Sequence, residues 1–253
     1  MVIDDKYIFI YGKHAVAEAL EFRPDVVLHL YLRDDQKNSF ASDLQSKAKH
    51  RTIFSGDNVP PEVDKKAVHQ GVIAKIDRYK LLQTYDDFRE KLQVTPNTAV
   101  VILGELEDPH NVGAVIRSAA GFGLTAVLIP KHRQAGVTGT VVKVSAGMAF
   151  KIPLVEVGNV NRVVEDLKKK GFFVYGLDGE GDTSLHTEQF TKPTAFILGN
   201  EGEGLRAKTR EHCDMVLSIP MHDQCESLNA SASAAVTFYQ WSAQHPDVLI
   251  KFA

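Results

Sequence analysis

The chain has 253 residues, of which 44% are hydrophobic and 24% are charged, and its formal net charge is −3. These fractions are near the average for globular proteins and exclude a disordered, collagen-like or coiled-coil chain. The slightly acidic balance also argues against a protein that coats nucleic acid through a broad basic surface, so any such contact must be local.

The sequence also indicates a compartment. No apolar run approaches the ~18 residues that span a bilayer. The first residues, Met1-Val2-Ile3-Asp4-Asp5-Lys6, carry acids where a signal peptide has its basic region. The two cysteines, Cys213 and Cys225, are too few for a disulfide framework. We therefore expect a cytoplasmic protein with reduced thiols and no membrane partner.

The first 77 residues alternate short apolar runs with stretches of helical periodicity, and Pro60-Pro61 interrupts them. This alternation predicts a small α/β domain over residues 1–77. Its predicted strands are Tyr7–Ile10, Val26–Leu32, Thr52–Phe54 and Val72–Ala74, and its predicted helices lie near residues 15–20 and 40–49.

Residues 78–96 are polar and are predicted to form a linker with one helix near Tyr85–Leu92. Residues 97–253 then alternate uninterrupted apolar runs with helical patterns. This alternation predicts a second α/β domain with a parallel sheet covered by helices on both faces. The predicted strands are 99–103, 126–129, 172–177, 195–198 and 216–219, and the helices are 112–122, 160–170 and 230–241.

Three segments follow predicted strands, where a parallel sheet normally holds its ligand. Each alone has an ordinary explanation as a helix cap, a turn or close helix packing. The usual fingerprints of nucleotide-binding loops are absent, which disfavours a kinase or an ordinary dehydrogenase. The segments contain, in order, Asn111, Gly113, Arg117 and Ala119; Gly199-Asn200-Glu201-Gly202-Glu203-Gly204; and Ile219-Pro220-Met221 with Ser227-Leu228-Asn229.

Together these segments resemble the three motifs of the SpoU family within the SPOUT superfamily, which are S-adenosylmethionine-dependent RNA ribose 2′-O-methyltransferases. The resemblance covers about residues 97–244. One departure is Ala230-Ser231-Ala232, where the family more often has Val-Ser-Val, and it costs packing volume without removing a catalytic group. The first domain resembles the family's RNA-binding domain of ribosomal-protein L30e type through Tyr11–Val16 and His69–Val72. This combination is most similar to the bacterial 23S rRNA guanosine-2′-O-methyltransferases.

The resemblance implies a deep trefoil knot in the second domain, which patterning alone would never propose. It also implies that backbone groups hold S-adenosylmethionine, and that Gly202 lets a loop close over it. A homodimer through the catalytic domain is implied as well, in agreement with the largely apolar last helix. The expected cofactor-binding residues are Leu198, Gly199, Gly202, Ile219 and Leu228, and the apolar residues of the last helix are Ala235, Val236, Phe238, Tyr239 and Trp241.

Arg117 is the residue that we expect to matter most for methyl transfer. The family proposal makes this arginine a general base, but a guanidinium group normally stays protonated in proteins. We favour a role in binding the phosphate beside the target nucleotide and in stabilising charge on the 2′ oxygen. Asn111 and Asn229 would orient Arg117 or the ribose. Ser227 and Glu201 would complete the polar shell, although a helix-capping role explains Glu201 equally well.

Two further groups of residues have side chains suited to a ligand. Contacts with RNA are expected from Lys13, His14, His69, Lys131 and Arg133, although a solvated basic face explains the last two equally well. His212, Cys213, His222 and Cys225 invite a zinc site, but adjacent ligands rarely chelate one ion and paired Cys-x₂-Cys spacing is missing. No metal is expected.

Three functions therefore remain open from the sequence. The first is methylation of a guanosine in 23S rRNA, with tRNA as the alternative substrate. The second is a non-catalytic RNA-binding assembly factor that keeps the fold, which the complete set of motif residues disfavours. The third is a small-molecule methyltransferase, which would leave the first domain without a role.

Overall fold

The computed structural model describes residues 6–33, 39–49, 52–54, 59–61, 63, 67–200 and 204–249. The chain forms two compact units that are not continuous in sequence. Unit 1 contains Met1–Leu82 and Val137–Lys151, and unit 2 contains Gln83–Gly136 and Ile152–Ala253. Each unit has its own sheet, which confirms the predicted mixed α/β fold with one small and one larger body.

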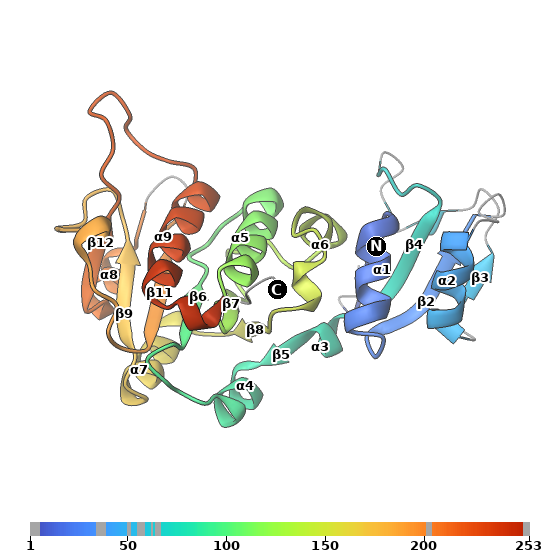
Figure 1. Ribbon diagram of the computed structural model, residues 1–253, viewed down its shortest axis with the longest axis horizontal. Helices are drawn as coiled ribbons and strands as arrows, with labels where there is room; N and C mark the ends of the chain where they lie inside the picture. Colours follow the sequence, from blue (N-terminus) through green and yellow to red (C-terminus); the bar gives the residue numbers. More distant parts are fainter. Residues whose placement is uncertain are drawn as a thin grey trace. The chain divides into compact units, whose positions relative to one another are not determined.

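Unit 1 is built on a four-stranded sheet (Figure 1). β4 is antiparallel to both of its neighbours, whereas β2 and β3 are parallel. In β1, Ile8 and Ile10 are buried and the residues between them are only half-buried, as expected for a sheet with one face against helices. The sheet order is β1 (Tyr7–Tyr11), β4 (Val72–Asp77), β2 (Val27–Leu32) and β3 (Thr52–Phe54), and the helices are α1 (Lys13–Phe22), α2 (Ser39–Ala48) and α3 (Arg78–Leu81).

Unit 1 also contains a segment from the middle of the chain, for which the sequence predicted no element. This segment holds α6 (Gly139–Val144) and a 3-10 helix, η2 (Met148–Phe150). A Cβ atom on Gly139 would collide with the carbonyl oxygen of Phe9, so α6 approaches β1 closely. The hydroxyl groups of Tyr11 and Thr140 lie 3.3 Å apart, and Lys151 Nζ lies 2.7 Å from Glu18 Oε2. The segment therefore packs on β1 and α1.

Unit 2 is built on an eight-stranded sheet, in which every pair from β10 to β8 is parallel. The predicted parallel sheet is thus confirmed. All residues of β6 and β11 are buried, as expected for strands covered on both faces. The order is β10 (Thr183–Ser184), β12 (Met215–Ser218), β9 (Phe173–Leu177), β11 (Thr194–Leu198), β6 (Ala99–Ile102), β7 (Ala126–Pro130), β8 (Leu154–Val157) and β5 (Leu82–Thr84).

Helices cover both faces of this sheet (Figure 1). α5 (Pro109–Gly121) and α9 (Ala230–Gln244) pack together on one face, where the rings of Phe196 and Phe238 are 5.9 Å apart. On the other face, α4 (Tyr85–Lys91) and α7 (Val160–Lys169) contribute Phe88 and Leu167 to the apolar core. The remaining helices are α8 (Ala207–His212), η3 (Leu185–Thr187) and η4 (Pro246–Val248).

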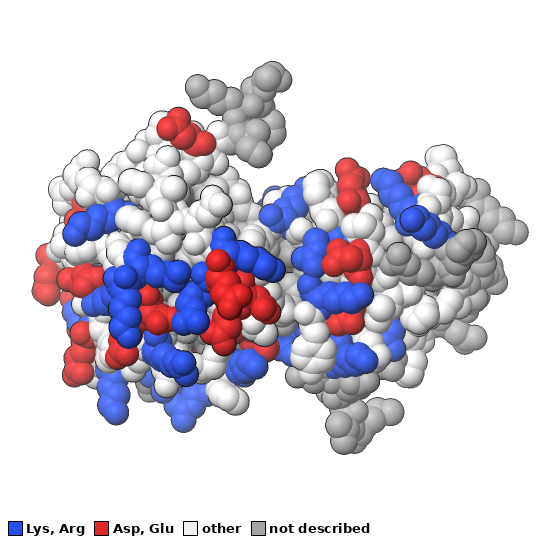
Figure 2. Space-filling model, turned by 90° about the horizontal axis from the view of Figure 1, so that it is seen from below, with Lys and Arg blue, Asp and Glu red and all other residues white. Residues whose placement is uncertain are grey.

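Surface charges of the two signs are interleaved. On the face seen in Figure 2, lysine and arginine side chains lie among aspartates and glutamates. In unit 2, Arg89 Nη1 lies 2.8 Å from Asp166 Oδ2, and Lys168 Nζ lies 2.8 Å from Asp214 Oδ1. Such pairing weakens any long-range attraction for a polyanion. Within the described ranges, no helix has both the length and the apolar character to cross a membrane.

Candidate active site

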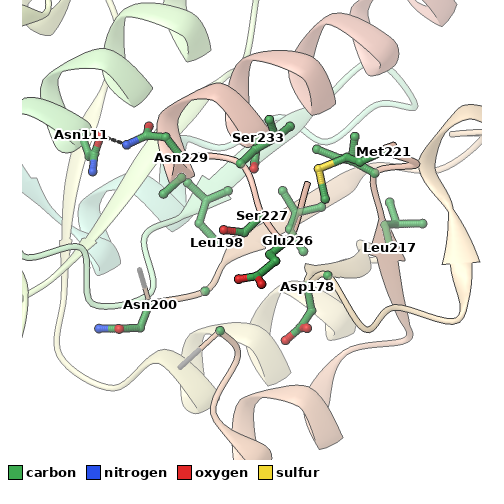
Figure 3. A pocket seen from close by; sticks show the side chains of 17 residues that line it. Asn111, Asp178, Leu198, Asn200, Leu217, Met221, Glu226, Ser227, Asn229 and Ser233 are labelled. Atoms are coloured by element: carbon green, nitrogen blue, oxygen red, sulfur yellow. Dashed lines mark hydrogen bonds between the residues drawn. The ribbon is translucent and has the colours of Figure 1, made fainter. Parts of the chain in front are cut away.

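A cavity of about 390 Å³ lies in unit 2 beyond the carboxyl ends of β9, β11 and β12. Its walls come from the turns after these strands and from the segment that leads into α9 (Figure 3). This is the place where a parallel sheet holds a ligand. Of the residues predicted from the sequence, the cavity brings together Asn111, Leu198, Gly199, Ile219, Ser227, Leu228 and Asn229. All three motifs therefore meet at one site.

Two asparagines connect the starts of α5 and α9 at this cavity. Asn229 Nδ2 donates to Asn111 Oδ1 at 3.0 Å, across 118 residues of sequence (Figure 3). Asn229 Oδ1 accepts from the backbone N–H and the hydroxyl of Ser231, so Asn229 is also the N-cap of α9. Asn111 is only 8% exposed. Both amide groups are consequently held in fixed orientations at the cavity wall.

The turn after β11 forms a wall of backbone. The N–H of Asn200 donates to the carbonyl of Gly204 at 2.8 Å, and the N–H of Gly204 donates back at 3.2 Å. A Cβ atom on Gly199 would lie 2.5 Å from the carbonyl carbon of Gly204. Only glycine therefore permits this approach. Glu201 and Gly202, which were also predicted here, lie outside the described residues.

The charged residues that line the described part of this cavity are both acidic. They are Asp178, which follows β9, and Glu226 (Figure 3). Asp178 Oδ2 accepts from the N–H of Leu205 at 3.1 Å and lies 3.5 Å from Arg210 Nη1. Arg210 offsets part of the charge of Asp178, and the negative charge that remains, chiefly that of Glu226, favours a ligand with positive charge over a phosphate-rich one.

Arg117 lies apart from this cavity. It is exposed on α5, six residues after Asn111 and therefore roughly 9 Å further along the helix axis. Its side chain forms no ion pair with any residue that the structure describes. Arg117 could reach a substrate that approaches from outside, but it does not line the ligand cavity of its own chain.

The expected RNA contacts fall in both units. In unit 1, the N–H of Lys13 donates to Gln70 Oε1 at 3.3 Å, and His69 Nδ1 accepts from the N–H of Gly71 at 3.1 Å. The turn that carries Lys13 and exposed His14 thus adjoins the turn that carries His69. In unit 2, Lys131 Nζ lies 3.1 Å from Glu156 Oε2, whereas Arg133 is exposed.

The four residues of the considered zinc site do not gather. No group of three or more metal-ligating side chains occurs in the part of the chain that the structure describes. His212 Nδ1 lies 2.7 Å from the carbonyl of Lys208, and His222 Nδ1 lies 2.8 Å from Asp223 Oδ1. Cys213 is partly buried, and this burial raises the pKa of its thiol to about 11.

The two thiols should therefore react differently. Because the thiolate is the nucleophile, iodoacetamide at about pH 8 is expected to alkylate exposed Cys225 and to leave Cys213 unmodified. Peptide mass spectrometry of the folded protein measures both, and urea-denatured protein is the control in which both should react. Equal modification in the folded protein would contradict the burial of Cys213.

The sequence did not single out every lining residue. Asp178 and Gly179 directly follow a predicted strand, so the same rule about carboxyl ends could have found them. Glu226 and Ser233 flank the third motif but had no distinguishing spacing. Other lining residues lie within the predicted motif segments but had no role assigned to them: Asn200, Gly204, Met221, Glu226, Ala230 and Ser233. The lining residues outside those segments are Leu177, Asp178, Gly179 and Leu217.

The fold and the cavity define an α/β protein whose parallel sheet holds a ligand beyond its strand ends. Residues 98–239 match the model of the SpoU rRNA Methylase family, and residues 9–82 match a model described as RNA 2′-O ribose methyltransferase substrate binding. The chain belongs to the SpoU rRNA methylase family. It is accordingly an RNA ribose 2′-O-methyltransferase with S-adenosylmethionine as its methyl donor.

Named relatives match nearly the whole chain. It is 36% identical to 23S rRNA (guanosine-2′-O-)-methyltransferase RlmB of Neisseria meningitidis, over 93% of this chain and 94% of the relative. It is 38% identical to the RlmB of Xanthomonas campestris, over 92% and 94%. Among solved structures, SpoU methyltransferase AviRb from Streptomyces viridochromogenes in complex with AdoMet has a TM-score of 0.83 and 25% identity, covering 95% of this chain and 91% of that one.

Proposed function

We propose that this enzyme methylates the ribose 2′-OH of a guanosine in 23S rRNA. The observation that carries the proposal is one cavity that is lined by residues of all three motifs and by two acidic side chains, Asp178 and Glu226. The names of relatives that match more than nine-tenths of the chain support guanosine and 23S rRNA. Because ribosomal RNA is the proposed substrate, we place the enzyme in the cytoplasm.

The cavity fits S-adenosylmethionine in charge and in shape. The sulfonium and ammonium groups of this cofactor outweigh its one carboxylate, so Asp178 and Glu226 complement its net positive charge. The close approach of Gly199 to Gly204 leaves a wall of backbone that hydrogen-bonds without side-chain bulk. When bound, the cofactor supplies a methyl group on a positively charged sulfur. Leu198, Gly199, Ile219 and Leu228 would hold it, and the family resemblance adds Gly202 to the cofactor-binding residues.

The protein residues then have to desolvate, align and stabilise the ribose hydroxyl. The coupled amides of Asn111 and Asn229 are suited to orient the ribose because both are already held in place. Ser227 supplies a hydroxyl at the same cavity. Glu201 keeps the role that its motif implies, as a further member of the polar shell. Arg117 stabilises the charge that develops on the 2′ oxygen, approaching from outside the cavity.

We further infer that unit 2 contains the trefoil knot of its family. Close contacts that join the turns after β6, β9 and β11 to one another and to strand β12 support this inference. A Cβ atom on Gly104 would collide with the carbonyl oxygen of Leu198. The N–H of Asp178 donates to the carbonyl of Leu217 at 3.1 Å, while the Asp178 carboxylate holds the N–H of Leu205.

The two parts of the chain are proposed to have separate duties. Unit 1, which contains residues 1–77, would recognise RNA through Lys13, His14 and His69, and unit 2 would carry out methyl transfer. The segment 78–96, predicted as a linker, supplies β5 and α4 to unit 2. The match of residues 9–82 to a substrate-binding model supports this division. Lys131 and Arg133 would contact RNA near the catalytic cavity.

We propose that the enzyme is a homodimer through the outer face of α9. On this face Val236 is 42% exposed and Tyr239 is 61% exposed. Fewer apolar side chains of this helix are exposed for a dimer contact than its sequence suggested, because Phe238 and Trp241 are fully buried in the core of their own unit. A dimer contact would therefore use Val236 and Tyr239, together with half-buried Ala235.

Light scattering tests the dimer. The wild type is expected at twice the chain mass of 27.9 kDa, and Tyr239→Glu, which places a charge in the proposed interface, is expected at 27.9 kDa. Tyr79→Glu is the matched control, since Tyr79 is 62% exposed on α3 in unit 1. A monomeric wild type at micromolar concentration would overturn the proposal.

The function is tested by nucleoside mass spectrometry of RNA from cells that lack the protein. We expect one 2′-O-methylguanosine to disappear from 23S rRNA and to return when the wild-type protein is supplied. Loss of a mark from tRNA would instead favour the tRNA alternative. If no mark is lost, the non-catalytic assembly factor becomes the better explanation.

A further inference from the structure

A second cavity, of about 510 Å³, lies next to the first in unit 2, and Arg133 is the one residue of its lining that the function proposed above uses apart from the wall shared with the first cavity. The two cavities share Leu198, Gly199 and Gly204, so the turn after β11 separates them. The other walls come from the turns after β6, β7 and β8 and from the start of α8. A ligand in the second cavity would thus contact the turn after β11 from the side opposite the first cavity.

The second cavity differs from the first in the sign of its charge. Its charged lining residues within the described ranges are Glu105, Arg133, Arg206 and Lys208, compared with two acids in the first cavity. Arg206 Nη2 lies 2.6 Å from Glu105 Oε2, so these two charges neutralise each other. Arg133 and Lys208 are exposed and form no ion pair with a residue that the structure describes. Among the described residues of its lining, the cavity consequently has two cations, Arg133 and Lys208, without an ionic partner.

Neutral hydrogen-bonding groups line the same cavity. Asn159 is the N-cap of α7, Asn161 lies in the first turn of that helix, and Thr209 lies in α8. Amide and hydroxyl groups of this kind are common partners of phosphate and sugar oxygens in nucleic-acid complexes. The combination therefore suits a polar, negatively charged chain rather than an apolar ligand.

The loops around this cavity are tied to one another. Gln134 Oε1 accepts from the N–H of Leu106 at 2.9 Å, and Gln134 Nε2 donates to the carbonyl of Leu106 at 2.8 Å. Asn200 Nδ2 donates to the carbonyl of Glu105 at 3.0 Å. These bonds join the turns after β6, β7 and β11, so the loop that carries Arg133 is fixed before any ligand binds.

We propose that the second cavity binds the RNA backbone beside the target nucleotide, with Arg133 and Lys208 contacting its phosphates. The inference rests on the proposed function, because the ribose that accepts the methyl group must lie at the first cavity. A ribose in an RNA chain carries a phosphate on each side, so those phosphates must lie close to the shared wall. Lys131 is not part of this site: it lies outside the cavity lining and is paired with Glu156.

The salt dependence of RNA binding tests this site directly. Each phosphate contact contributes about 0.7 to the slope of log affinity against log salt concentration for a single strand. Using the full-length protein and a 23S rRNA transcript, we expect Arg133→Gln and Lys208→Gln each to weaken binding roughly fivefold and to reduce the slope by about 0.7. The double variant should lose about twice as much slope.

Lys170→Gln is the matched control. This substitution also removes one positive charge from an exposed side chain. Lys170 follows the last residue of α7, whereas the residues that line the cavity lie at the start of that helix. Its affinity and salt slope should equal those of the wild type. Calorimetry should show unchanged affinity for S-adenosylmethionine in all variants, because neither cation lines the first cavity.

The site and the proposed function can fail separately. If Arg133→Gln and Lys208→Gln keep the wild-type slope while the wild type methylates 23S rRNA, the second cavity is not an RNA site and the function stands. If the wild type methylates tRNA and not 23S rRNA, the proposed substrate is wrong. The salt slopes of the same variants, measured with tRNA, then show whether the second cavity binds RNA. If Lys170→Gln lowers the salt slope of RNA binding as much as Arg133→Gln and Lys208→Gln do, the effect is one of general surface charge. The proposal that the second cavity binds RNA would then be wrong.

Discussion

Replacement of Arg117 by alanine is expected to lower turnover by about 100- to 1,000-fold and to leave the affinity for S-adenosylmethionine almost unchanged. The expected loss is large because a cation placed at a developing oxyanion acts mainly in the transition state. Cofactor affinity should persist because Arg117 does not line the cavity and lies roughly 9 Å along α5 from Asn111. Single-turnover methylation of RNA and calorimetry with the cofactor measure the two quantities.

Arg162→Ala provides the control, since Arg162 is an exposed arginine on α7 of the same unit. Arg117→Lys separates charge from geometry: a lysine keeps the charge but lacks the planar fork that contacts two oxygens at once. Near-normal turnover of Arg117→Ala would remove this residue from the mechanism. A parallel loss of cofactor affinity would instead indicate a structural role.

Gly199→Ala is expected to weaken S-adenosylmethionine binding by at least about 100-fold, because one methyl group there meets backbone rather than a movable side chain. The added Cβ would lie 2.5 Å from the carbonyl carbon of Gly204 and 2.8 Å from its oxygen. The reciprocal hydrogen bonds between Asn200 and Gly204 would have to break. The cofactor wall would then change shape. Calorimetry measures the affinity.

Gly136→Ala controls for the general effect of adding a methyl group. Gly136 has no atom within 4 Å of a built Cβ, and its φ is not in the left-handed region. Thermal unfolding of both variants distinguishes a local change from global loss of structure. If folded Gly199→Ala binds the cofactor normally, the cofactor site is elsewhere.

Most of the larger sheet could be predicted because its central strands are short apolar runs without a polar interruption. β8 escaped prediction because Glu156 interrupts its short apolar run. α8 escaped because none of its six residues is buried, so it has no apolar periodicity to detect. α6 is equally short, and its buried face consists of Gly139, Val141 and Val142.

The candidate site could be predicted where side chains with distinctive chemistry occupy recognisable motifs. Asn111 and Asn229 were placed correctly at one cavity, but their direct hydrogen bond joins residues 118 positions apart and has no local signal. The outer face of α9 could not be identified either. Phe238 and Tyr239 are adjacent in an apolar helix, and only the packing on β11 decides that Phe238 is buried while Tyr239 is exposed.

The segment that contains α6 has a consequence for how this protein can be divided. The chain passes between the two units three times, after Leu82, after Gly136 and after Lys151. A single cut near residue 77 would therefore remove the sheet of unit 1 and leave Val141 and Val142, both fully buried in the intact chain, without their cover. The substrate-binding part is thus not an interchangeable cassette: a chimaera that exchanges it between relatives has to carry residues 137–151 along with residues 1–82.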